Sequence, residues 1–216
     1  MVVKRYLQPI LGVLCLAGAL TFTALITRYG VLPMDTAVYG WIAAHLISPG
    51  LTPVIQVVTQ LASAVVLIVL TIIILVFVRN RRIGVAVALN LALAALLNQV
   101  IKRCIQRPRP YVTHLVVEHG FSFPSGHSMA ATAFYGFLVF LVWHYVGNRA
   151  ARTALIVPCA AIIPVILFTR VYLGVHWASD VLAGCLFSLA WLLLVAVPAA
   201  REFLLEPGPR PQHARR

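Results

Sequence analysis

Polar residues that could carry chemistry lie in three short segments of a strongly apolar chain. The segments are Lys102–Pro110, Pro124–His127 and Arg170–Asp180, and they supply cations, histidines, a hydroxyl group and a carboxylate. A phosphoryl group in transfer spreads its charge over three equatorial oxygens, so its site needs several fixed donors aimed at that group. The three segments therefore indicate phosphoryl transfer at one site.

The donors for the phosphate oxygens are expected in all three segments. Lys102, Arg109 and Arg170 are the candidate cations. Arg can make planar two-point contact with oxygens, whereas Lys acts as a point charge. Ser125 precedes an expected helix, so its hydroxyl could donate to the phosphate while backbone N–H groups of the helix start face the anion. Gly126 would let the backbone approach the phosphate closely.

The three segments, with Thr169 in place of the usual Ser, resemble the type 2 phosphatidic acid phosphatase superfamily. Its pattern is Lys-x6-Arg-Pro, Pro-Ser-Gly-His and Ser-Arg-x5-His-x3-Asp, and the chain matches every other position. The resemblance implies that His176 attacks phosphorus and becomes a phosphohistidine, that His127 protonates the leaving oxygen, and that Asp180 orients His176. It implies no metal and no other cofactor. A spacing of four residues would place His176 and Asp180 on one face of a helix that begins there.

Other polar residues of the same region have simpler explanations. Arg103 and Arg107 are expected to be solvated or to touch lipid headgroups. His114, Glu118 and His119 could suggest a metal cluster, but they lie in a polar loop without an evident fourth ligand. Simple exposure of these three side chains is therefore favoured.

Polar residues elsewhere in the chain also have structural interpretations. Asp35 and Arg28 flank another loop and could pair with each other or anchor it. Asn90 and Asn98 lie eight residues apart in one apolar run, where side-chain amides usually bond to neighbouring helices. The four cysteines have no spacing that suits a thiolate metal site.

The elements that position these residues are membrane-spanning helices. Of the 216 residues, 62% are hydrophobic and only 10% are charged, and the mean hydropathy is +0.96, which excludes an ordinary water-soluble domain. A spanning helix needs about 20 apolar residues. The chain is therefore expected to be an all-α polytopic membrane protein, with a short interfacial helix over 34–48. The six expected spans are 8–27, 52–78, 83–101, 127–147, 153–173 and 180–199.

The formal net charge of +12 comes from basic residues placed between apolar runs, a pattern that does not suit nucleic-acid binding. With the amino terminus inside, the inner segments hold 11 of the 17 basic residues. Because Lys and Arg concentrate in cytoplasmic loops, both termini are expected in the cytoplasm. A single domain is expected over 1–206, followed by a disordered cytoplasmic tail, 207–216. The six remaining cations are Arg28, Lys102, Arg103, Arg107, Arg109 and Arg170.

These expectations describe a metal-independent hydrolase of the bacterial cytoplasmic membrane, with its active site on the periplasmic or extracellular side. The resemblance implies a lipid phosphate or pyrophosphate as substrate, such as undecaprenyl pyrophosphate, phosphatidylglycerophosphate or phosphatidic acid. The spanning runs argue against the soluble vanadium haloperoxidases, which share these motifs. Two alternatives remain on the same scaffold: a lipid-phosphate phosphotransferase and a non-catalytic lipid transporter.

Overall fold

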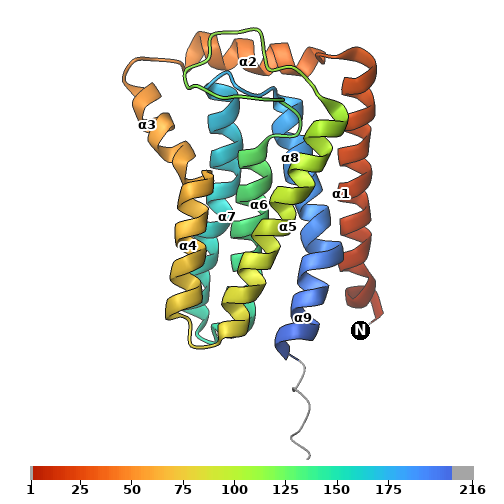
Figure 1. The fold of residues 1–216 in the computed structure, drawn as a ribbon, viewed down its shortest axis with the longest axis vertical. Helices are drawn as coiled ribbons and strands as arrows, with labels where there is room; N and C mark the ends of the chain where they lie inside the picture. Colours follow the sequence, from red (N-terminus) through yellow and green to blue (C-terminus); the bar gives the residue numbers. More distant parts are fainter. Residues whose placement is uncertain (1, 206–216) are drawn as a thin grey trace, which may run out of the picture.

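The computed structural model describes residues 2–205, which form a bundle of helices closed at one end by a helix that lies across it (Figure 1). Within these residues no strand occurs, as the all-α expectation requires. The expected tail 207–216 lies outside the described residues. The elements are α1 (Val2–Tyr29), α2 (Pro33–His45), α3 (Leu51–Val58), the 3-10 turn η1 (Thr59–Ala62), α4 (Ala64–Phe77), α5 (Arg81–Ile105), α6 (Gly126–Tyr145), α7 (Arg149–Tyr172), α8 (Ala178–Trp191), the π-helical turn η2 (Leu192–Ala196) and α9 (Val197–Leu205).

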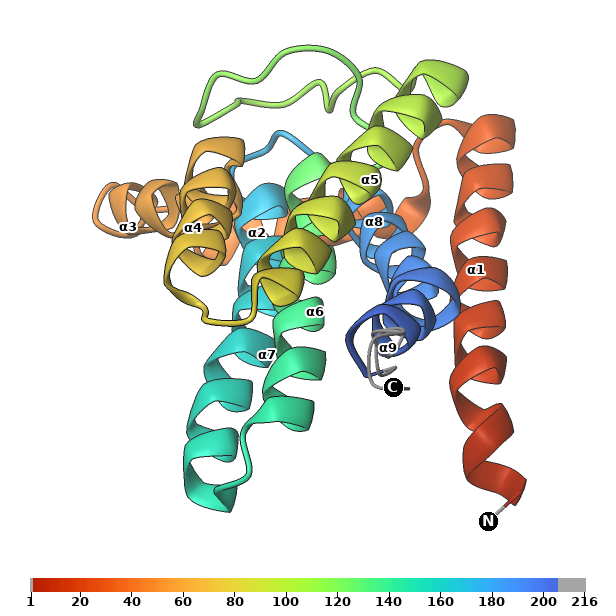
Figure 2. The ribbon, with the colours of Figure 1, turned by 60° about the horizontal axis from the view of Figure 1, so that its bottom comes forward.

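Five continuous helical segments are long and apolar enough to cross a membrane, and α3 with α4 makes a sixth if the bent pair is counted as one span. Large apolar side chains point away from the bundle, including Val65 and Phe77, which are 72% and 79% exposed. Such a surface needs lipid around it, because water would leave it unstable. Helices α6 and α7 pack as a pair, and α8 lies between them and α1 (Figure 2).

The second expected span is not one helix over 52–78. The chain bends by 47° between α3–η1 and α4. At the break, Ser63 has an extended backbone (φ −69°, ψ 150°), and its side chain accepts the Val66 N–H at 3.3 Å as the N-cap of α4. Hydropathy records only that the run is apolar, so it could not show that a serine ends one helix there and starts the next.

The expected interfacial helix over 34–48 is present as α2, which lies across the end of the bundle (Figure 1). Pro33 opens it, as is common at the first helical position. Trp41 is 56% exposed and stacks on His45, as suits an aromatic residue at a membrane surface. One side chain of α2, Asp35, is fully buried against the bundle.

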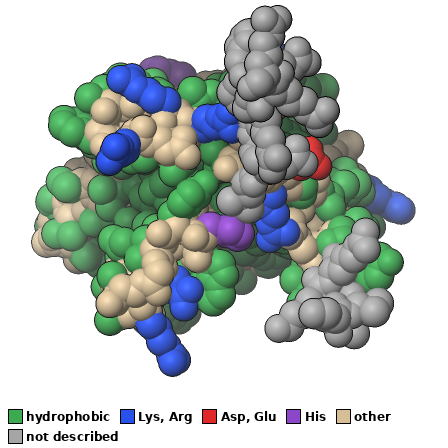
Figure 3. All heavy atoms as spheres, turned by 90° about the horizontal axis from the view of Figure 1, so that it is seen from below, with side chains coloured by type: hydrophobic (Ala, Val, Ile, Leu, Met, Phe, Trp, Pro, Cys, Tyr) green, Lys and Arg blue, Asp and Glu red, His purple; other side chains and the backbone are tan. Residues whose placement is uncertain are grey.

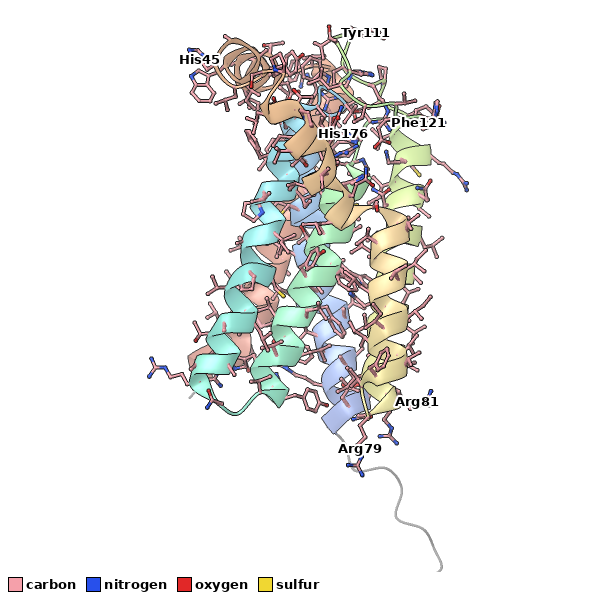
Figure 4. All side chains as sticks on the ribbon, turned by 90° about the vertical axis from the view of Figure 1, so that its left-hand side faces the viewer. His45, Arg79, Arg81, Tyr111, Phe121 and His176 are labelled. Carbon is pink, nitrogen blue, oxygen red and sulfur yellow. The ribbon has the colours of Figure 1, made fainter. Side chains whose placement is uncertain are left out.

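The three polar segments meet at the α2 end of the bundle, where α5 and α7 end and α6 and α8 begin (Figure 4). Gln106 ends α5 in the left-handed conformation, with φ 52°. Gly174 has φ +71°, and a Cβ there would lie 2.5 Å from the Thr113 carbonyl oxygen. Only glycine allows this backbone and this close approach, which bring the loop after α5 onto the turn before α8.

The two asparagines of α5 bond to neighbouring helices, as expected. Asn90 Nδ2 donates to the Ala133 carbonyl at 2.9 Å, and its Oδ1 accepts from Trp191 Nε1 at 2.9 Å. Asn98 Nδ2 donates to the Pro124 carbonyl at 3.1 Å. The same Nδ2 lies 3.1 Å from Met129 Sδ on α6, so Asn98 fixes the start of α6, and therefore one wall of the candidate site, relative to α5.

Candidate active site

A polar cavity of about 360 Å³ opens at the α2 end of the bundle. Residues from α5, the loop after α5, the start of α6 and the turn before α8 line this cavity, so all three polar segments contribute to one site. Figure 4 shows His176 and Phe121 at this end and Arg79 and Arg81 at the opposite one. The polar side chains lining the cavity are Asn98, Gln99, Lys102, Arg103, Arg109, Glu118, His119, His127 and His176.

His176 lies in the turn before α8 rather than on the helix. Its Nδ1 is 3.3 Å from Ser122 Oγ and 3.7 Å from Asp180 Oδ2. Its Nε2 is 3.3 Å from Arg109 Nη1. A hydrogen on Nδ1, directed toward Ser122 Oγ and the Asp180 carboxylate behind it, therefore leaves the Nε2 lone pair on the cationic side of the ring.

The pKa of His176 is lowered from 6.5 to about 4, first because burial disfavours the charged ring. The nearby carboxylate of Asp180 raises this pKa in part, and the charges of Arg170 and Arg109 lower it. The ring is therefore neutral at physiological pH, and a neutral imidazole keeps the lone pair that a nucleophile needs.

Asp180 reaches His176 although the two residues do not share a helix face. Helix α8 begins at Ala178, so Asp180 sits in its first turn and its Oδ2 accepts the Trp177 N–H at 2.9 Å. The same oxygen accepts the Ser122 hydroxyl at 2.5 Å. Ser122 was not among the expected site residues, since its place beside Asp180 depends on how the loop after α5 folds back.

Arg107 is buried, contrary to the expectation that it is solvated. It is 6% exposed, and it bridges two carboxylates. Nη1 donates to Asp180 Oδ1 at 2.5 Å and to Ser179 Oγ at 2.8 Å, and Nη2 donates to Asp35 Oδ2 at 2.8 Å. Buried carboxylates need a countercharge, and the planar guanidinium fork can serve two at once.

Asp35 pairs with Arg107 and not with Arg28, whose guanidinium lies over the Tyr29 ring. Asp35 Oδ1 also accepts the Ser179 N–H at 2.8 Å, and Oδ2 accepts the Leu32 N–H at 3.1 Å. The bond from Leu32 caps α2, whereas the bonds from Ser179 and Arg107 join the start of α2 to the start of α8 and to the loop after α5. The anchoring role considered for Asp35 is confirmed.

Glu118 is not simply exposed. It forms ion pairs with Arg170 Nη2 and, at 3.5 Å, with Arg109 Nη2. Burial alone would raise the pKa of Glu118, but the neighbouring cations, Arg170 first, hold this pKa below its ordinary value. The carboxylate is therefore ionised and lies against two of the expected phosphate-binding cations.

Thr59 fixes the Arg170 guanidinium, because its hydroxyl oxygen accepts a hydrogen bond from Nη1 at 2.9 Å. Thr59 lies in η1, the turn that breaks the second expected span. The Thr169 hydroxyl donates to the same Thr59 oxygen at 3.1 Å, so the threonine in place of the family serine keeps a hydroxyl contact. The bend between α3 and α4 thus places a polar group behind the arginine.

Lys102 and Arg109 contact the loop backbone. Lys102 Nζ donates to the Phe121 carbonyl. Arg109 donates to the carbonyls of Gly120 at 3.1 Å, His119 at 2.7 Å and Val175 at 2.9 Å. Both cations are therefore held beside the cavity by the loop that carries Glu118, and Arg109 also by the turn before α8.

Ser125 and Gly126 differ in their placement. Ser125 is fully buried and caps α6, with its Oγ 3.4 Å from the Ser128 N–H and 3.0 Å from Ser128 Oγ. Gly126 lines the cavity, where a Cβ would lie 3.4 Å from Asn98 Oδ1. A Ser125 hydroxyl that donates to phosphate remains a prediction.

Over residues 2–205, no three His, Cys, Asp or Glu side chains converge as a metal site would require. His114 Nε2 lies 2.9 Å from the Pro110 carbonyl oxygen, while Glu118 is paired with arginines. The structure therefore does not support the metal cluster considered for His114, Glu118 and His119.

An apolar cavity of about 520 Å³ adjoins the polar one. It lies against α4, α5 and the start of α6, and it shares Asn98, Gln99, Gly126 and His127 with the polar cavity. Alanines such as Ala92 and Ala95 on α5 form part of its wall. A lipid could therefore place its phosphate in the polar cavity and its apolar chain in the adjoining apolar cavity.

The fold and the site define an integral membrane phosphatase, and the chain belongs to the PAP2 superfamily, whose family model matches residues 83–202. It is 38% identical to phosphatidylglycerophosphatase B of Bacillus subtilis over 74% of this chain and 80% of that protein. It is 29% identical to an undecaprenyl-diphosphatase of Sulfolobus acidocaldarius over 56% of this chain and 57% of that protein.

Among solved structures, the chain resembles a transmembrane PAP2-type phosphatidylglycerolphosphate phosphatase from Bacillus subtilis. The TM-score is 0.78 at 32% identity, and the match covers 89% of this chain and 96% of that one. The protein is therefore a membrane lipid phosphatase with a transmembrane PAP2 fold.

The Arg107 bridge predicts that substitution of Arg107 destabilises the protein far more than substitution of Arg103, four residues earlier. Arg107→Ala leaves Asp35 and Asp180 buried without their shared cation, which should cost about 3–5 kcal/mol and lower the midpoint of thermal unfolding in detergent by about 10 °C. Arg103→Ala, at an exposed position of the same segment, is the control and should leave the midpoint unchanged. Equal midpoints for the two variants would contradict the bridge.

Proposed function

We propose that the chain hydrolyses a lipid phosphate or pyrophosphate through a phosphohistidine on His176. The observation that carries the proposal is the placement of that ring: one nitrogen faces Asp180 and Ser122, and the other faces Arg109 in a cationic cavity. A neutral imidazole held in this way is a nucleophile oriented toward an anion site. The adjoining apolar cavity supports an amphiphilic substrate.

In the first proposed step, the Nε2 lone pair of His176 forms a bond to phosphorus while the bond from phosphorus to the lipid oxygen breaks. His127 gives its proton to that leaving oxygen. In the second step, His127 takes a proton from a water molecule, whose oxygen attacks phosphorus and releases His176. Lys102, Arg109 and Arg170 stabilise the charge on the phosphoryl oxygens in both steps.

Candidate substrates follow from the two cavities together. Phosphatidylglycerophosphate and undecaprenyl pyrophosphate are the substrates named by the relatives' activities, and phosphatidic acid is a third lipid with a terminal phosphate. Each has a phosphate group for the polar cavity and an apolar chain for the space between α4 and α5. Binding energy from the chain would hold the phosphate in place for attack.

We propose that residues 1–206 form a single domain with six spans, counting α3 and α4 as one, and with both termini in the cytoplasm. Arg79 lies in the short loop before α5, and Arg81 and Arg149 are the first residues of α5 and α7, at the end away from the cavity. Figure 3 shows Lys and Arg side chains around that end. Because basic loops stay cytoplasmic, this charge pattern favours an active site on the outer side of a bacterial cytoplasmic membrane.

Substitution of the nucleophile tests the hydrolytic function. His176→Ala should lower phosphate release from a panel of lipid phosphates by at least about 1,000-fold, because the proposed covalent intermediate forms on this ring. His45→Ala, which changes an exposed histidine on α2, is the matched control and should retain wild-type release. Substantial activity of the His176 variant would contradict the proposed route, and no release by wild type from any lipid would favour a transporter.

Filling the apolar cavity tests the placement of the lipid chain. Ala95→Phe should reduce kcat/KM for a long-chain phosphatidic acid by about tenfold, since the ring would occupy space that the chain needs. Activity toward a short-chain, water-soluble analogue should stay within about twofold of wild type. Leu93→Phe, on a different exposed face of α5, is the control. The same loss for both chain lengths would place the lipid chain elsewhere.

A natural cysteine, Cys104, tests which side of the membrane the active site faces. Cys104 is exposed and lies one residue before the end of α5, beside the polar cavity. A membrane-impermeant maleimide should label it in intact cells, and Cys104→Ser should abolish the label. Asn80→Cys in the Cys104→Ser background should be labelled only after permeabilisation, because it lies at the opposite end. The reverse pattern would invert the topology.

A further inference from the structure

Glu118 is the one acidic residue in the loop from Gln106 to Ser125, and it lies on the cations expected to bind phosphate. Its carboxylate accepts from Arg170 Nη2, and its other oxygen is 3.5 Å from Arg109 Nη2. Both arginines are therefore paired with an anion of the chain itself. A phosphate that uses the same donors must compete with that anion.

The carboxylate satisfies Arg170 incompletely. Thr59 accepts from Nη1 and Glu118 from Nη2, but Nε is a buried donor without a hydrogen-bond partner among residues 2–205. A carboxylate offers two oxygens, whereas a phosphoryl group offers three. Arg170 Nε is therefore a donor that Glu118 does not use and that an additional phosphoryl oxygen could accept from.

The acid can move more easily than the cation it contacts. The Arg170 side chain is 1% exposed and is fixed by Thr59, whereas the Glu118 side chain is 26% exposed. Glu118 belongs to an irregular loop in which its neighbour Val117 is 84% exposed. Displacement of the carboxylate into solvent would leave Arg170 in position, because the contact with Thr59 does not depend on Glu118.

We propose that Glu118 is an internal anion that occupies the phosphate-binding cations of the free enzyme and is displaced by the phosphate of the substrate. The proposal rests on the proposed function, since it assigns phosphate to Arg109 and Arg170. Competition of this kind weakens the binding of every phosphate, including the inorganic phosphate released by hydrolysis. Glu118 therefore promotes product release and sets how tightly a phosphate headgroup binds.

Direct anion binding tests this role without turnover. Orthovanadate and inorganic phosphate are titrated into the full-length protein in detergent, and the dissociation constants are compared for wild type, Glu118→Gln and Glu202→Gln. Removal of the competing charge should tighten both anions by about tenfold or more in Glu118→Gln. Glu202→Gln removes the same charge from an exposed position on α9 and should bind as wild type does. The KM for lipid phosphate should fall in parallel with these constants.

Unchanged or weaker anion binding by Glu118→Gln would overturn the proposal, because it would make Glu118 a neutral or supporting part of the site. That result differs from failure of the proposed function, in which wild type itself would neither bind phosphate nor release it from lipid. If Glu118→Gln unfolds, Glu118→Asp gives the same test. Its shorter side chain should reach Arg170 poorly and tighten anion binding, and wild-type binding by this variant would also overturn the proposal.

Discussion

A buried arginine between two buried carboxylates is the interaction on which the site depends. Arg107 joins Asp35, at the start of α2, to Asp180, at the start of α8. Each aspartate also accepts the backbone N–H three residues earlier, so each caps the helix on which it lies. Because charges buried in a membrane protein are costly, the three groups are stable only together. The bridge therefore fixes the helix across the bundle end to the helix that orients the nucleophile.

The chemistry of the site follows from how the Asp180 oxygens are shared. Oδ1 is taken by Arg107, so Oδ2 remains for Ser122, the Trp177 N–H and the facing nitrogen of His176. Burial and the cations Arg170 and Arg109 lower the pKa of His176, while Asp180 partly opposes them. The result is a neutral ring with a defined orientation beside a group of positive charges. In the proposed mechanism these cations bind the phosphate, and Glu118 pairs with two of them, Arg109 and Arg170, when no phosphate is present.

Much of this architecture could be predicted from the sequence, because apolar length and motif spacing are local properties. They located the helices, the interfacial helix and the three segments that meet at one end. The parts that could not be predicted depend on contacts between distant segments. Spacing did not show that Arg107, rather than Arg103, is buried, since that depends on Asp35, 72 residues away along the chain. Nor could hydropathy reveal the bend at Ser63, which brings Thr59 behind Arg170, or the loop that brings Glu118 onto the same arginine.

The orientation of His176 can be tested most directly by finding which ring nitrogen carries the phosphoryl group. The enzyme is mixed with a lipid phosphate, quenched in alkali on a millisecond time scale, digested and examined by ³¹P NMR and mass spectrometry. Since Nδ1 faces an Asp180 that Arg107 holds in place, we expect phosphorylation of His176 at Nε2. Phosphate on Nδ1 of His176 or on another residue, or no phosphoenzyme in a preparation that turns over, would contradict it.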